Sequence, residues 1–336
     1  MASMPIHAWA AQKKKGPLGP FEYAPAPLGP HDVEIAISHC GICHSDVHLV
    51  DGDWGVGAYP MVPGHEIVGS VVEAGPAVRH LEVGQRVGVG WQRSACLVCE
   101  VCTRGEENLC SHDEATCVNH HGGFADRIRT DARFAFPVPE ELSSEAAAPL
   151  LCGGVTVYAP LSRLTRPSLR VGIVGVGGLG HLGIQFARAM GCEVTAISSS
   201  PEKEDDARRL GAHHFVVTRG EGALRGLGRT LDVVLSTAFV NQDWPGLVAA
   251  LRPNGTLCLV GVPTEPLTVS AGALLGAQRS VTGSAIGGRP ALGEMLDFAA
   301  RHGVAAEVQV RSMAEADAAL DDVRRGRARY RAVLAT

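Results

Sequence analysis

The chain has little charge, few aromatic side chains and no long hydrophobic run. Charged residues make up 19% and aromatic residues 5% of its 336 residues. No stretch approaches the roughly 18 to 20 apolar residues that a membrane-spanning helix needs. The segment from Met1 to Gln12 also lacks the basic start and apolar run of a secretion signal. We therefore expect a cytoplasmic protein that does not bind membranes.

Basic charge is scarce as well. The net charge is −5, and the one basic cluster is Lys13, Lys14 and Lys15. Proteins that bind nucleic acid present clustered Lys and Arg to the phosphates. The net charge and the lack of further basic clusters therefore predict that the protein does not bind nucleic acid. We interpret the three lysines as part of a solvated turn.

Glycine and proline are abundant, with 41 and 20 residues. Such a composition is typical of tight turns and close backbone packing, not of a coiled coil or a disordered chain. A chain of this length exceeds one ordinary hydrophobic core, so we expect about two domains of mixed α/β structure.

Short strands separated by turns are predicted in the first 150 residues. The segment DVEIAIS, Asp32 to Ser38, alternates polar and apolar residues. The segments SVVEAG, QRVGVGW and ARFAFPVP repeat the pattern of a short strand followed by a turn. This half should form a β-rich, partly closed unit.

From about Val155 the pattern changes to buried strands that alternate with helices. RVGIVGV is followed by an apolar helical stretch to Met190, the strand CEVTAIS and a charged helix from Glu202 to Leu210. The series continues through HHFVVT, LDVVLST, a helix near Trp244 to Leu251, and TLCLVGV. It predicts six parallel strands with helices on both faces.

The tail from Ala291 predicts a further set of elements. An amphipathic helix, ALGEMLDFAARHG, precedes the strand VAAEVQV, an acidic helix and the strand YRAVLA. Periodicity does not tell which domain this tail joins.

The most specific chemical signal is a set of closely spaced cysteines. The segment CLVCEVCTRGEENLC places Cys96, Cys99, Cys102 and Cys110 where four thiolates can surround one tetrahedral ion. Zn²⁺ prefers this arrangement, and four protein ligands leave no open position, so the site would be structural. An iron–sulfur cluster is an alternative, because thiolates also bind iron.

A second set of metal-binding residue types is spread along the chain. Cys43 lies in CGICHSDVH, His65 and Glu66 in GHE, and Cys152 in LLCGG. A catalytic zinc takes three protein ligands and keeps one position for water or substrate. Spacing cannot pair residues this far apart, so a buried Cys152 and a hydrogen-bonded His65 stay open as alternatives.

A glycine-rich motif, GVGGLG, joins the strand RVGIV to the helix that begins near His181. Glycines let the strand turn sharply and let the backbone approach a pyrophosphate, which the free amides of the helix N-terminus bind. Because a strand precedes it and a helix follows, we predict a dinucleotide site. Its residues are Gly175, Gly177, Gly178, Leu179 and Gly180.

The end of the next strand selects the dinucleotide. An NAD site places a carboxylate about 20 residues past the glycines, whereas hydroxyls and a lysine suit the 2′-phosphate of NADP(H). Glu202 and Glu204 argue against NADP(H), although acidic residues also stabilise the start of a helix. We predict NADP(H), bound by Ser198, Ser199, Ser200 and Lys203.

The chain resembles the zinc-dependent alcohol dehydrogenases of the medium-chain dehydrogenase/reductase superfamily, with the cinnamyl alcohol dehydrogenase group as the nearest branch. The resemblance is carried by CGICHSDVH, GHE, the four-cysteine segment, LLCGGVTVY and GVGGLGHLGIQFA. The resemblance covers nearly the whole chain and extends to GSAIGG and RARYRAVL. It implies a GroES-like catalytic domain over residues 1–152, to which residues 291–336 return. It also implies a Rossmann NADP(H)-binding domain over residues 153–290, and a homodimer.

The resemblance assigns roles to the dispersed set. It implies that Cys43, His65 and Cys152 bind a catalytic zinc and that Glu66 exchanges with water or substrate. Cys40 is not a ligand in this pattern, and Asp46 orients His65. With the structural site, the family implies two zinc ions in each chain.

Proton transfer and cofactor contacts are implied in the same way. Ser45 lies at the substrate oxygen, and His48 ends a relay that runs through the cofactor ribose. The implied cofactor-binding residues are His44, Thr156, Gly175, Gly177, Gly178, Leu179, Gly180, Ser198, Ser199, Ser200, Lys203, Gly261, Ser284 and Ile286.

Several residues do not transfer directly from the family pattern. Trp54 and Trp91 fall where the family lines its substrate pocket, although packing in the core would explain them as well. We interpret His120 and His121 as polar loop residues. Cys117, Cys192 and Cys258 match no ligand position, so we expect ordinary buried thiols.

The predicted function is hydride transfer between NADP(H) and a primary alcohol or its aldehyde, with an apolar or aromatic substrate of the cinnamyl type. Two alternatives are open. One is a zinc-free quinone or enoyl reductase of the same superfamily, and the other is a non-catalytic zinc protein that binds NADPH.

Overall fold

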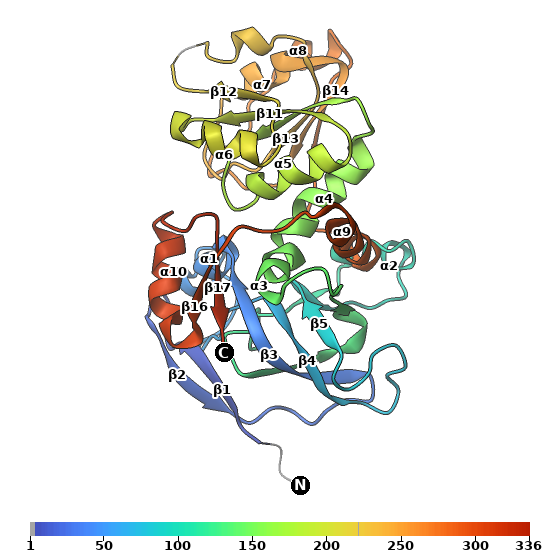
Figure 1. Cartoon of the computed structure of the whole chain (residues 1–336), viewed down its shortest axis with the longest axis vertical. Helices are drawn as coiled ribbons and strands as arrows, with labels where there is room; N and C mark the ends of the chain where they lie inside the picture. The colour runs from blue at the N-terminus through green and yellow to red at the C-terminus, as the bar shows by residue number, and fades with distance from the viewer. Residues whose placement is uncertain (1–3, 221) are drawn as a thin grey trace. The chain divides into compact units, whose positions relative to one another are not determined.

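The computed structural model describes residues 4–220 and 222–336. The chain forms two compact units (Figure 1). Unit 1 comprises the described residues up to Gly153 together with Gly287–Thr336, and unit 2 comprises the described residues of Gly154–Ile286. Unit 1 is therefore assembled from two segments that are far apart in the sequence.

Unit 1 is built on a seven-stranded sheet. Its strands are β3 (Asp32–Ile42), β4 (Glu66–Ala74), β5 (Arg86–Val89), β8 (Arg127–Asp131), β9 (Ala135–Pro137), β16 (Val308–Ser312) and β17 (Arg331–Ala335). The order is β16-β17-β3-β4-β5-β9, and β8 pairs with β3. The predicted β-rich first domain is confirmed, and the alternating segment from Asp32 extends to Ile42.

One predicted strand is shorter than expected. Within ARFAFPVP, the residues Ala132–Phe134 form the 3-10 helix η2, and only Ala135–Pro137 pair in the sheet. The Asp131 side chain accepts a hydrogen bond from the Arg133 amide and caps this turn. A short capping side chain thus overrides the β-propensity of the segment.

The tail joins unit 1. Helix α9 (Arg289–His302) and helix α10 (Ala316–Arg324) flank β16, and β17 pairs antiparallel with β3. Leu334 of β17 lies opposite Cys40 of β3 in the register. The last strand in the chain thus lies between two other strands of the sheet.

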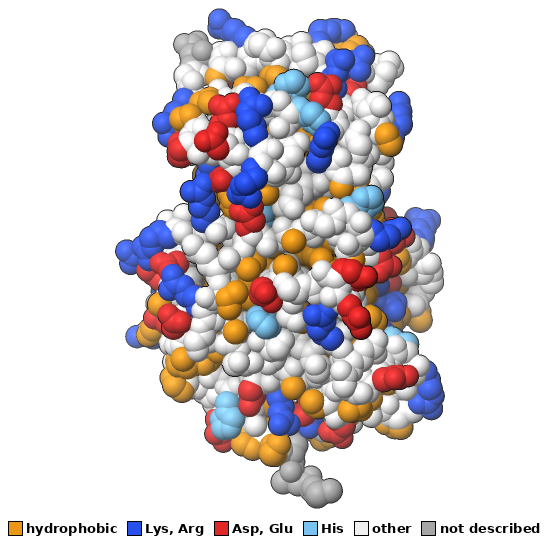
Figure 2. Space-filling model, in the orientation of Figure 1, with side chains coloured by type: hydrophobic (Ala, Val, Ile, Leu, Met, Phe, Trp, Pro, Cys, Tyr) orange, Lys and Arg blue, Asp and Glu red, His pale blue; other side chains and the backbone are white. Residues whose placement is uncertain are grey.

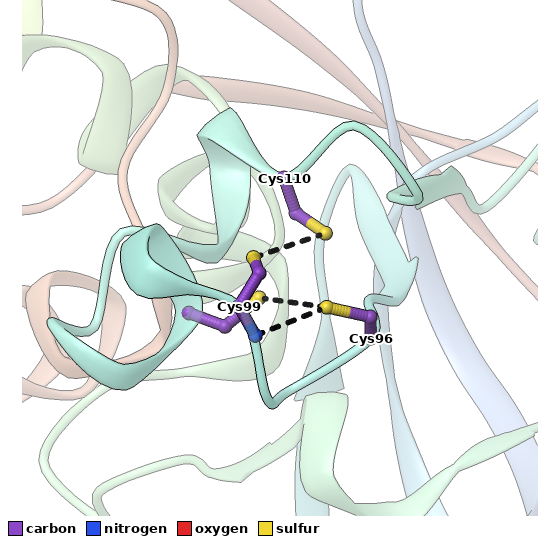
Figure 3. A group of neighbouring side chains, drawn as sticks. Cys96, Cys99 and Cys110 are labelled. Carbon is purple, nitrogen blue, oxygen red and sulfur yellow. Dashed lines mark hydrogen bonds between the residues drawn. The ribbon is translucent and has the colours of Figure 1, made fainter.

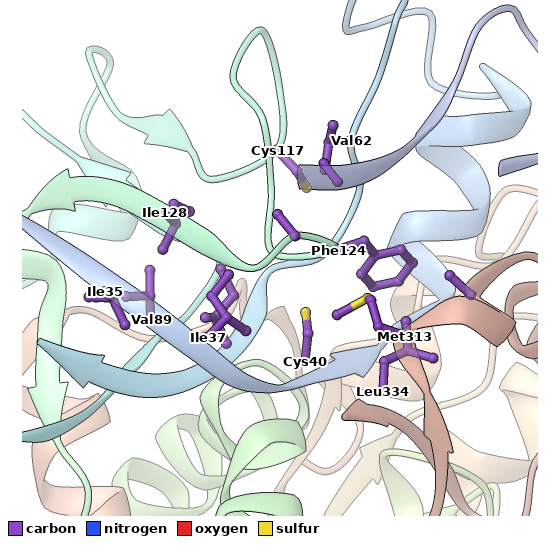
Figure 4. Close-up of a cluster of buried hydrophobic side chains, with 14 of the residues drawn as sticks. Ile35, Ile37, Cys40, Val62, Val89, Cys117, Phe124, Ile128, Met313 and Leu334 are labelled. Carbon is purple, nitrogen blue, oxygen red and sulfur yellow. The ribbon is translucent and has the colours of Figure 1, made fainter. Parts of the chain in front are cut away.

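The hydrophobic core of unit 1 is formed by side chains of this sheet together with side chains of the N-terminal hairpin, α1 (His44–Asp51) and α10. Cys40, Phe124, Met313 and Leu334 come together from segments far apart in the chain (Figure 4). The antiparallel hairpin of β1 (Ile6–Ala11) and β2 (Leu18–Tyr23) contributes further buried side chains to the same cluster.

Unit 2 is a six-stranded sheet in which every neighbouring pair is parallel, as predicted. The strands are β10 (Arg170–Val174), β11 (Glu193–Ser198), β12 (His214–Val217), β13 (Leu231–Ser236), β14 (Leu251–Leu259) and β15 (Ser280–Gly283). The order β12-β11-β10-β13-β14-β15 reverses direction between β10 and β13. In open parallel sheets, ligands bind at the carboxyl ends of the strands beside such a reversal.

The helices of unit 2 follow the predicted alternation. They are α5 (Gly180–Ala189), α6 (Glu204–Arg209), α7 (Trp244–Ala250) and α8 (Ala271–Leu275), and α4 (Gly153–Leu164) begins at the boundary of the unit. Helix α5 packs against β10 and β11, and α7 packs against β14. The predicted charged helix begins with a 3-10 turn, η4 (Pro201–Lys203), before α6.

No helix in the described ranges is long and apolar enough to span a bilayer. On the face shown in Figure 2, basic and acidic side chains are interspersed. Lys13, Lys14 and Lys15 are exposed in a turn, where the Lys14 ammonium donates a hydrogen bond to the Gly52 carbonyl.

Candidate active site

Four cysteine sulfurs converge in a small part of unit 1, residues 96–110, which we call the cysteine lobe. Cys99 caps the N-terminus of helix α2 (Glu100–Thr103), and Cys110 follows the 3-10 helix η1 (Glu107–Leu109). The sulfurs of Cys96, Cys99, Cys102 and Cys110 all lie within 4.8 Å of one another. Figure 3 shows the side chains of Cys96, Cys99 and Cys110 pointing toward one another.

The spacing of these sulfurs suits a single zinc ion. The Sγ atoms of Cys96 and Cys102 are 3.9 Å apart, and those of Cys99 and Cys110 are 3.8 Å apart. Zn–S bonds of about 2.3 Å in a tetrahedron give S–S edges of about 3.8 Å. Thiolates that bind separate irons of a cluster stand further apart, so the predicted zinc fits better than the iron–sulfur alternative.

Backbone amides support negative charge in the lobe. The amides of Cys99 and His112 donate hydrogen bonds to the sulfurs of Cys96 and Cys110. Bonds from the Val98 and Cys99 amides lower the pKa of Cys96 to about 6. Burial raises the pKa of Cys102 to about 12, so binding of a cation would release protons from the set.

The dispersed set also converges. Cys43 caps the N-terminus of helix α1 (His44–Asp51), His65 and Glu66 lie at the start of β4, and Cys152 follows the 3-10 helix η3 (Ala148–Leu151). The ligand atoms of these four residues lie within 4.8 Å of one another. Cys40 is not in this group.

Two buried atoms in this group have no hydrogen-bond partner among the described residues. They are Nε2 of His65 and Oε2 of Glu66, and both side chains are fully buried. A buried polar atom without a partner is costly, and a cation at the shared point would satisfy both. Two thiols, an imidazole and a carboxylate are a donor set that suits zinc.

Asp46 holds two members of the group in place. Its Oδ1 atom accepts hydrogen bonds of 2.9 Å from His65 Nδ1 and from the Gly64 amide. Its Oδ2 atom accepts a bond of 2.8 Å from the Cys43 amide. Because the proton of His65 is held on Nδ1, the lone pair of Nε2 faces the other three side chains.

The thiols of Cys43 and Cys152 have pKa values shifted in opposite directions. A hydrogen bond from Cys152 lowers the pKa of Cys43 well below its ordinary value, and the same bond and burial raise the pKa of Cys152. Burial raises the pKa of Glu66 to about 7. Burial opposes a charged His65, but the charge of Asp46 and its hydrogen bond to the ring, together with the electrostatic effect of Cys152, outweigh burial and raise the pKa of that imidazole.

Sequence reasoning missed Arg331. It is buried on β17, and its Nη2 atom donates a hydrogen bond to Glu66 Oε1. Its guanidinium supplies positive charge that opposes the effect of burial on the pKa of Glu66. RARYRAVL was recognised as a family segment, but only the pairing of β17 with β3 brings this arginine to the site.

The predicted relay residues lie along α1. Ser45 Oγ is 3.6 Å from Cys43 Sγ, and the rings of His44 and His48 are 5.0 Å apart. Asp53, which sequence reasoning also missed, lies 2.9 Å from His48 Nδ1. Burial, together with the charge of His48, lowers the pKa of His44.

Two tryptophans form an aromatic series with this site. The Trp91 ring lies 4.8 Å from that of His65, and Trp54 lies 6.1 Å from Trp91 and 5.2 Å from His48. Trp54 is 43% exposed. Both rings therefore stand beside candidate site residues, and Trp91 also packs against the hydrophobic core of unit 1.

The remaining cysteines and histidines fall outside the two metal groups described above, but Cys117 forms a third group of possible ligands with Asp46 and His65. Cys117, Cys192 and Cys258 are buried, as predicted, but Cys117 Sγ lies 3.8 Å from His65 Nδ1. His120 lies 3.3 Å from Glu114, and His121 packs against Tyr23.

In unit 2 the glycine motif forms the turn between β10 and α5. A Cβ atom at Gly180 would lie 1.7 Å from the Gly175 carbonyl oxygen, so this position excludes any side chain. Gly175 has φ of +88°, a conformation that favours glycine. The N-terminus of α5 thus directly follows a turn that requires glycine at positions 175 and 180.

The predicted phosphate site lies at the carboxyl end of β11. Ser199 is exposed, whereas Ser198 is buried and its hydroxyl accepts a hydrogen bond from the Ser200 amide. Lys203 donates a bond of 2.6 Å to the Val176 carbonyl and so lies against the glycine turn.

The other predicted cofactor residues of unit 2 lie on three segments. Thr156 is on α4, Gly261 follows β14, and Ser284 and Ile286 follow β15. The Ser284 hydroxyl accepts a hydrogen bond of 2.9 Å from Arg163, a residue that the motifs did not indicate.

Known proteins resemble the chain over its whole length. Family models described as alcohol dehydrogenase GroES-like domain and zinc-binding dehydrogenase match residues 29–140 and 178–301. An aldehyde reductase of Synechocystis sp. is 42% identical over 98% of each chain. A solved cinnamyl alcohol dehydrogenase from Sorghum bicolor is 38% identical, with a TM-score of 0.94 over 99% of this chain and 98% of that one.

A second solved relative carries a cofactor. The protein called CAD from Helicobacter pylori, in complex with NADP(H), is 33% identical, with a TM-score of 0.90 over 99% of this chain and 98% of that one. Relatives that are 39% to 43% identical are named for mannitol, 8-hydroxygeraniol and formaldehyde dehydrogenases. The chain is therefore a zinc-containing alcohol dehydrogenase or aldehyde reductase of the medium-chain dehydrogenase/reductase superfamily, in the branch of the cinnamyl alcohol dehydrogenases.

Proposed function

We propose that the enzyme interconverts primary alcohols and aldehydes with NADP(H), and that its preferred substrates are apolar or aromatic. The observation that carries the proposal is the convergence of Cys43, His65, Glu66 and Cys152, which lie far apart in the sequence, on one point. Cys43, His65 and Cys152 are the proposed ligands, and Glu66 is a reserve ligand. The zinc-free alternative needs no such set, and a non-catalytic protein does not agree with membership of this enzyme family.

Zinc in this site supplies a Lewis acid that stabilises negative charge on the carbonyl oxygen during hydride transfer. The chain's own residues set up that chemistry. Asp46 keeps the His65 proton on Nδ1, so Nε2 is free to act as a ligand. Arg331 holds one oxygen of Glu66, which leaves Oε2 facing the shared point.

The substrate oxygen must gain a proton during reduction, and we assign the transfer to Ser45 and His48. Asp53 accepts from His48 Nδ1 at 2.9 Å, and this bond favours the tautomer whose Nε2 can take up or release a proton. The bond between Asp53 and His48 is solvent-exposed, so His48 can exchange its proton with water.

We assign the phosphate site of NADP(H) to Ser199, Ser200 and Lys203. No carboxylate stands among residues 198–200 at the end of β11, where an NAD site would hold the ribose 2′-hydroxyl. The Helicobacter pylori relative with bound NADP(H) supports this choice.

We assign substrate selection to Trp54 and Trp91. Their rings lie edge to face, next to His65 and His48, and aromatic rings favour flat apolar substrates. The test is NADPH oxidation by the zinc-loaded enzyme with acetaldehyde, cinnamaldehyde, benzaldehyde and a terpenoid aldehyde. A kcat/KM for acetaldehyde above that for every aromatic aldehyde would contradict the substrate class.

The variant Trp54→Ala sharpens this test. Loss of one ring contact of about 1.4 kcal/mol should raise the KM for cinnamaldehyde about tenfold and leave the KM for acetaldehyde nearly unchanged. Val83 is 65% exposed and is not among the candidate site residues, so Val83→Ala is a control that should change neither KM.

We also propose a homodimer formed through unit 2. Among the described residues, β15 has a strand partner on one side only, and an unpaired strand edge favours pairing with a second chain. Leu275 and Val262 of the same unit are 79% and 78% exposed. These two side chains give a second chain apolar surface to bury.

A further inference from the structure

The chain returns from unit 2 to unit 1 through residues 286–290, which we call the connector. Gly288 caps the N-terminus of α9 and packs against the cysteine lobe. A Cβ atom at Gly288 would lie 1.9 Å from the Gly105 carbonyl oxygen, and one at Gly105 would lie 2.6 Å from Pro290. The backbone of the connector and that of the lobe are therefore in direct contact.

Glu107 supplies the polar part of this contact. It is 2% exposed and lies on η1, between two of the lobe's cysteines. Its Oε2 atom accepts a hydrogen bond of 3.0 Å from the Arg289 amide, and Oε1 lies 3.4 Å from Arg289 Nη1. A buried carboxylate that binds both the main chain and the side chain of one residue restricts that residue strongly.

Arg289 links the connector to the packing around the sulfurs. Its Nε atom donates a hydrogen bond of 2.7 Å to the Arg133 carbonyl, and its guanidinium lies 5.5 Å above the Phe134 ring. Phe134 packs with Cys102 and Cys110 in one buried cluster. Phe134 thus contacts both the connector, through Arg289, and two of the lobe's cysteines.

The connector begins with a strained residue. Ile286 has φ of +40°, in the left-handed region that a β-branched residue rarely adopts. Strain of this kind persists only where the surroundings hold it, and it is common at ligand-binding sites. Under the proposed function, Ser284 and Ile286 contact the nucleotide, and Arg289 is three residues further along the chain.

We propose that Glu107 and Arg289 are positioning residues through which the metal-loaded cysteine lobe holds the connector in the conformation that the nucleotide requires. The inference rests on the proposed nucleotide contacts of Ser284 and Ile286. By this proposal the cysteine lobe not only stabilises its own part of unit 1 but also raises the affinity for NADPH. Because coupling between two sites is reciprocal, NADPH must in turn stabilise the lobe.

The test is hydrogen–deuterium exchange of the zinc-loaded full chain with and without NADPH, read by mass spectrometry. In the wild type, NADPH slows exchange in peptides from the connector and from the cysteine lobe. In Glu107→Gln the lobe no longer responds to NADPH. The Kd for NADPH rises about tenfold, because one charge-assisted hydrogen bond is worth about 1.4 kcal/mol. The kcat at saturating NADPH stays within about twofold, since only binding is affected.

Two further variants support the reading of this test. Glu106→Gln makes the same charge change in the same lobe, and the described structure shows no side-chain hydrogen bond or ion pair for Glu106, so it should behave as the wild type. Arg289→Lys keeps the bond from the main-chain amide to Glu107 and loses the guanidinium contacts. It should weaken NADPH binding about threefold, less than Glu107→Gln. Zinc content should be unchanged in every variant.

A lobe that does not respond to NADPH in the wild type would overturn the proposal, as would a Glu107→Gln protein that behaves like Glu106→Gln. If Glu107→Gln does not fold, Arg289→Lys decides by the same comparison. Absence of NADPH protection at the Gly175–Gly180 turn of the wild type would instead refute the proposed nucleotide site.

Discussion

At the scale of single residues, Cys43 tests the catalytic site most directly. Cys43→Ala removes one of three ligands and should lower kcat/KM at least about a thousandfold, because Lewis-acid stabilisation is worth several kcal/mol. The Kd for NADPH should be nearly unchanged, and zinc analysis should find one ion fewer in each chain. Turnover and fluorescence titration measure the two effects.

Cys40→Ala provides a matched control for Cys43→Ala. Cys40 lies three residues earlier and is fully buried, but it is outside the ligand group. The variant should keep its zinc and most of its kcat. Near-normal turnover in Cys43→Ala, or loss of zinc in Cys40→Ala, would show that the ligands are assigned wrongly.

Ser199 tests the cofactor choice. Ser199→Asp places a carboxylate at the exposed end of β11, where it repels a 2′-phosphate and can bind a ribose hydroxyl. The ratio of kcat/KM for NADPH over NADH should fall about 10- to 100-fold, which corresponds to about 1.4 to 2.7 kcal/mol. Thr218→Asp, near the end of the neighbouring β12, is the control, and an equal fall in both variants would contradict the assignment.

The two groups of metal-binding residue types that the sequence indicated come together in the structure, but the sequence did not indicate the contacts that hold them. The spacing of Cys96 to Cys110 specifies a single site because the ligands are close in sequence. Cys43, His65 and Cys152 required the family pattern. Arg331 and Asp53 were missed because arginines and aspartates are common on surfaces, and only tertiary pairing shows which of them meets Glu66 or His48.

At the scale of secondary structure, we expect a variant in the cysteine lobe to lower the stability of the protein without lowering its kcat. It has only short helices, so a bound metal must provide much of its folding free energy. Cys99→Ser should lower the melting temperature by about 6 to 12 °C, as expected for a loss of about 3 kcal/mol in a domain of this size. The kcat of the protein that stays folded should change little.

Differential scanning calorimetry of the zinc-loaded chain measures this change. Cys192→Ser, a buried thiol of unit 2 that is in neither metal group, is the control and should shift the transition by much less. A selective loss of kcat without a change in melting temperature would indicate that the lobe takes part in catalysis.

Elements with strong periodicity were predicted more accurately than those set by capping. The parallel strands of unit 2 follow apolar runs such as Val171–Val174, and the structure confirms them. The 3-10 helices at Ala132 and Pro201 were missed because a hydrogen bond from one side chain and the fixed φ of one proline decide them. The membership of the tail in unit 1 depends on the pairing of β17 with β3, which periodicity does not contain.

At the scale of the whole molecule, the proposed homodimer can be tested by light scattering coupled to size-exclusion chromatography. The wild type should elute with twice the mass of one chain. Leu275→Glu should raise the dimer dissociation constant at least about tenfold, because it places a charge in an apolar interface. Leu109→Glu, at an exposed leucine of unit 1, is the control, and a wild-type monomer would contradict the proposal.

The strand order of unit 1 also has a consequence for biosynthesis. On a ribosome, β3 and β4 emerge early, but β17 emerges only after unit 2 has been translated in full. Until then β8 already pairs with residues 32–36 of β3, but residues 39–42 of β3 lack the strand they pair with, and Arg331 is absent from Glu66. Nascent chains should therefore complete unit 2 before unit 1, and the exposed edge of β3 makes chaperones most relevant during that interval.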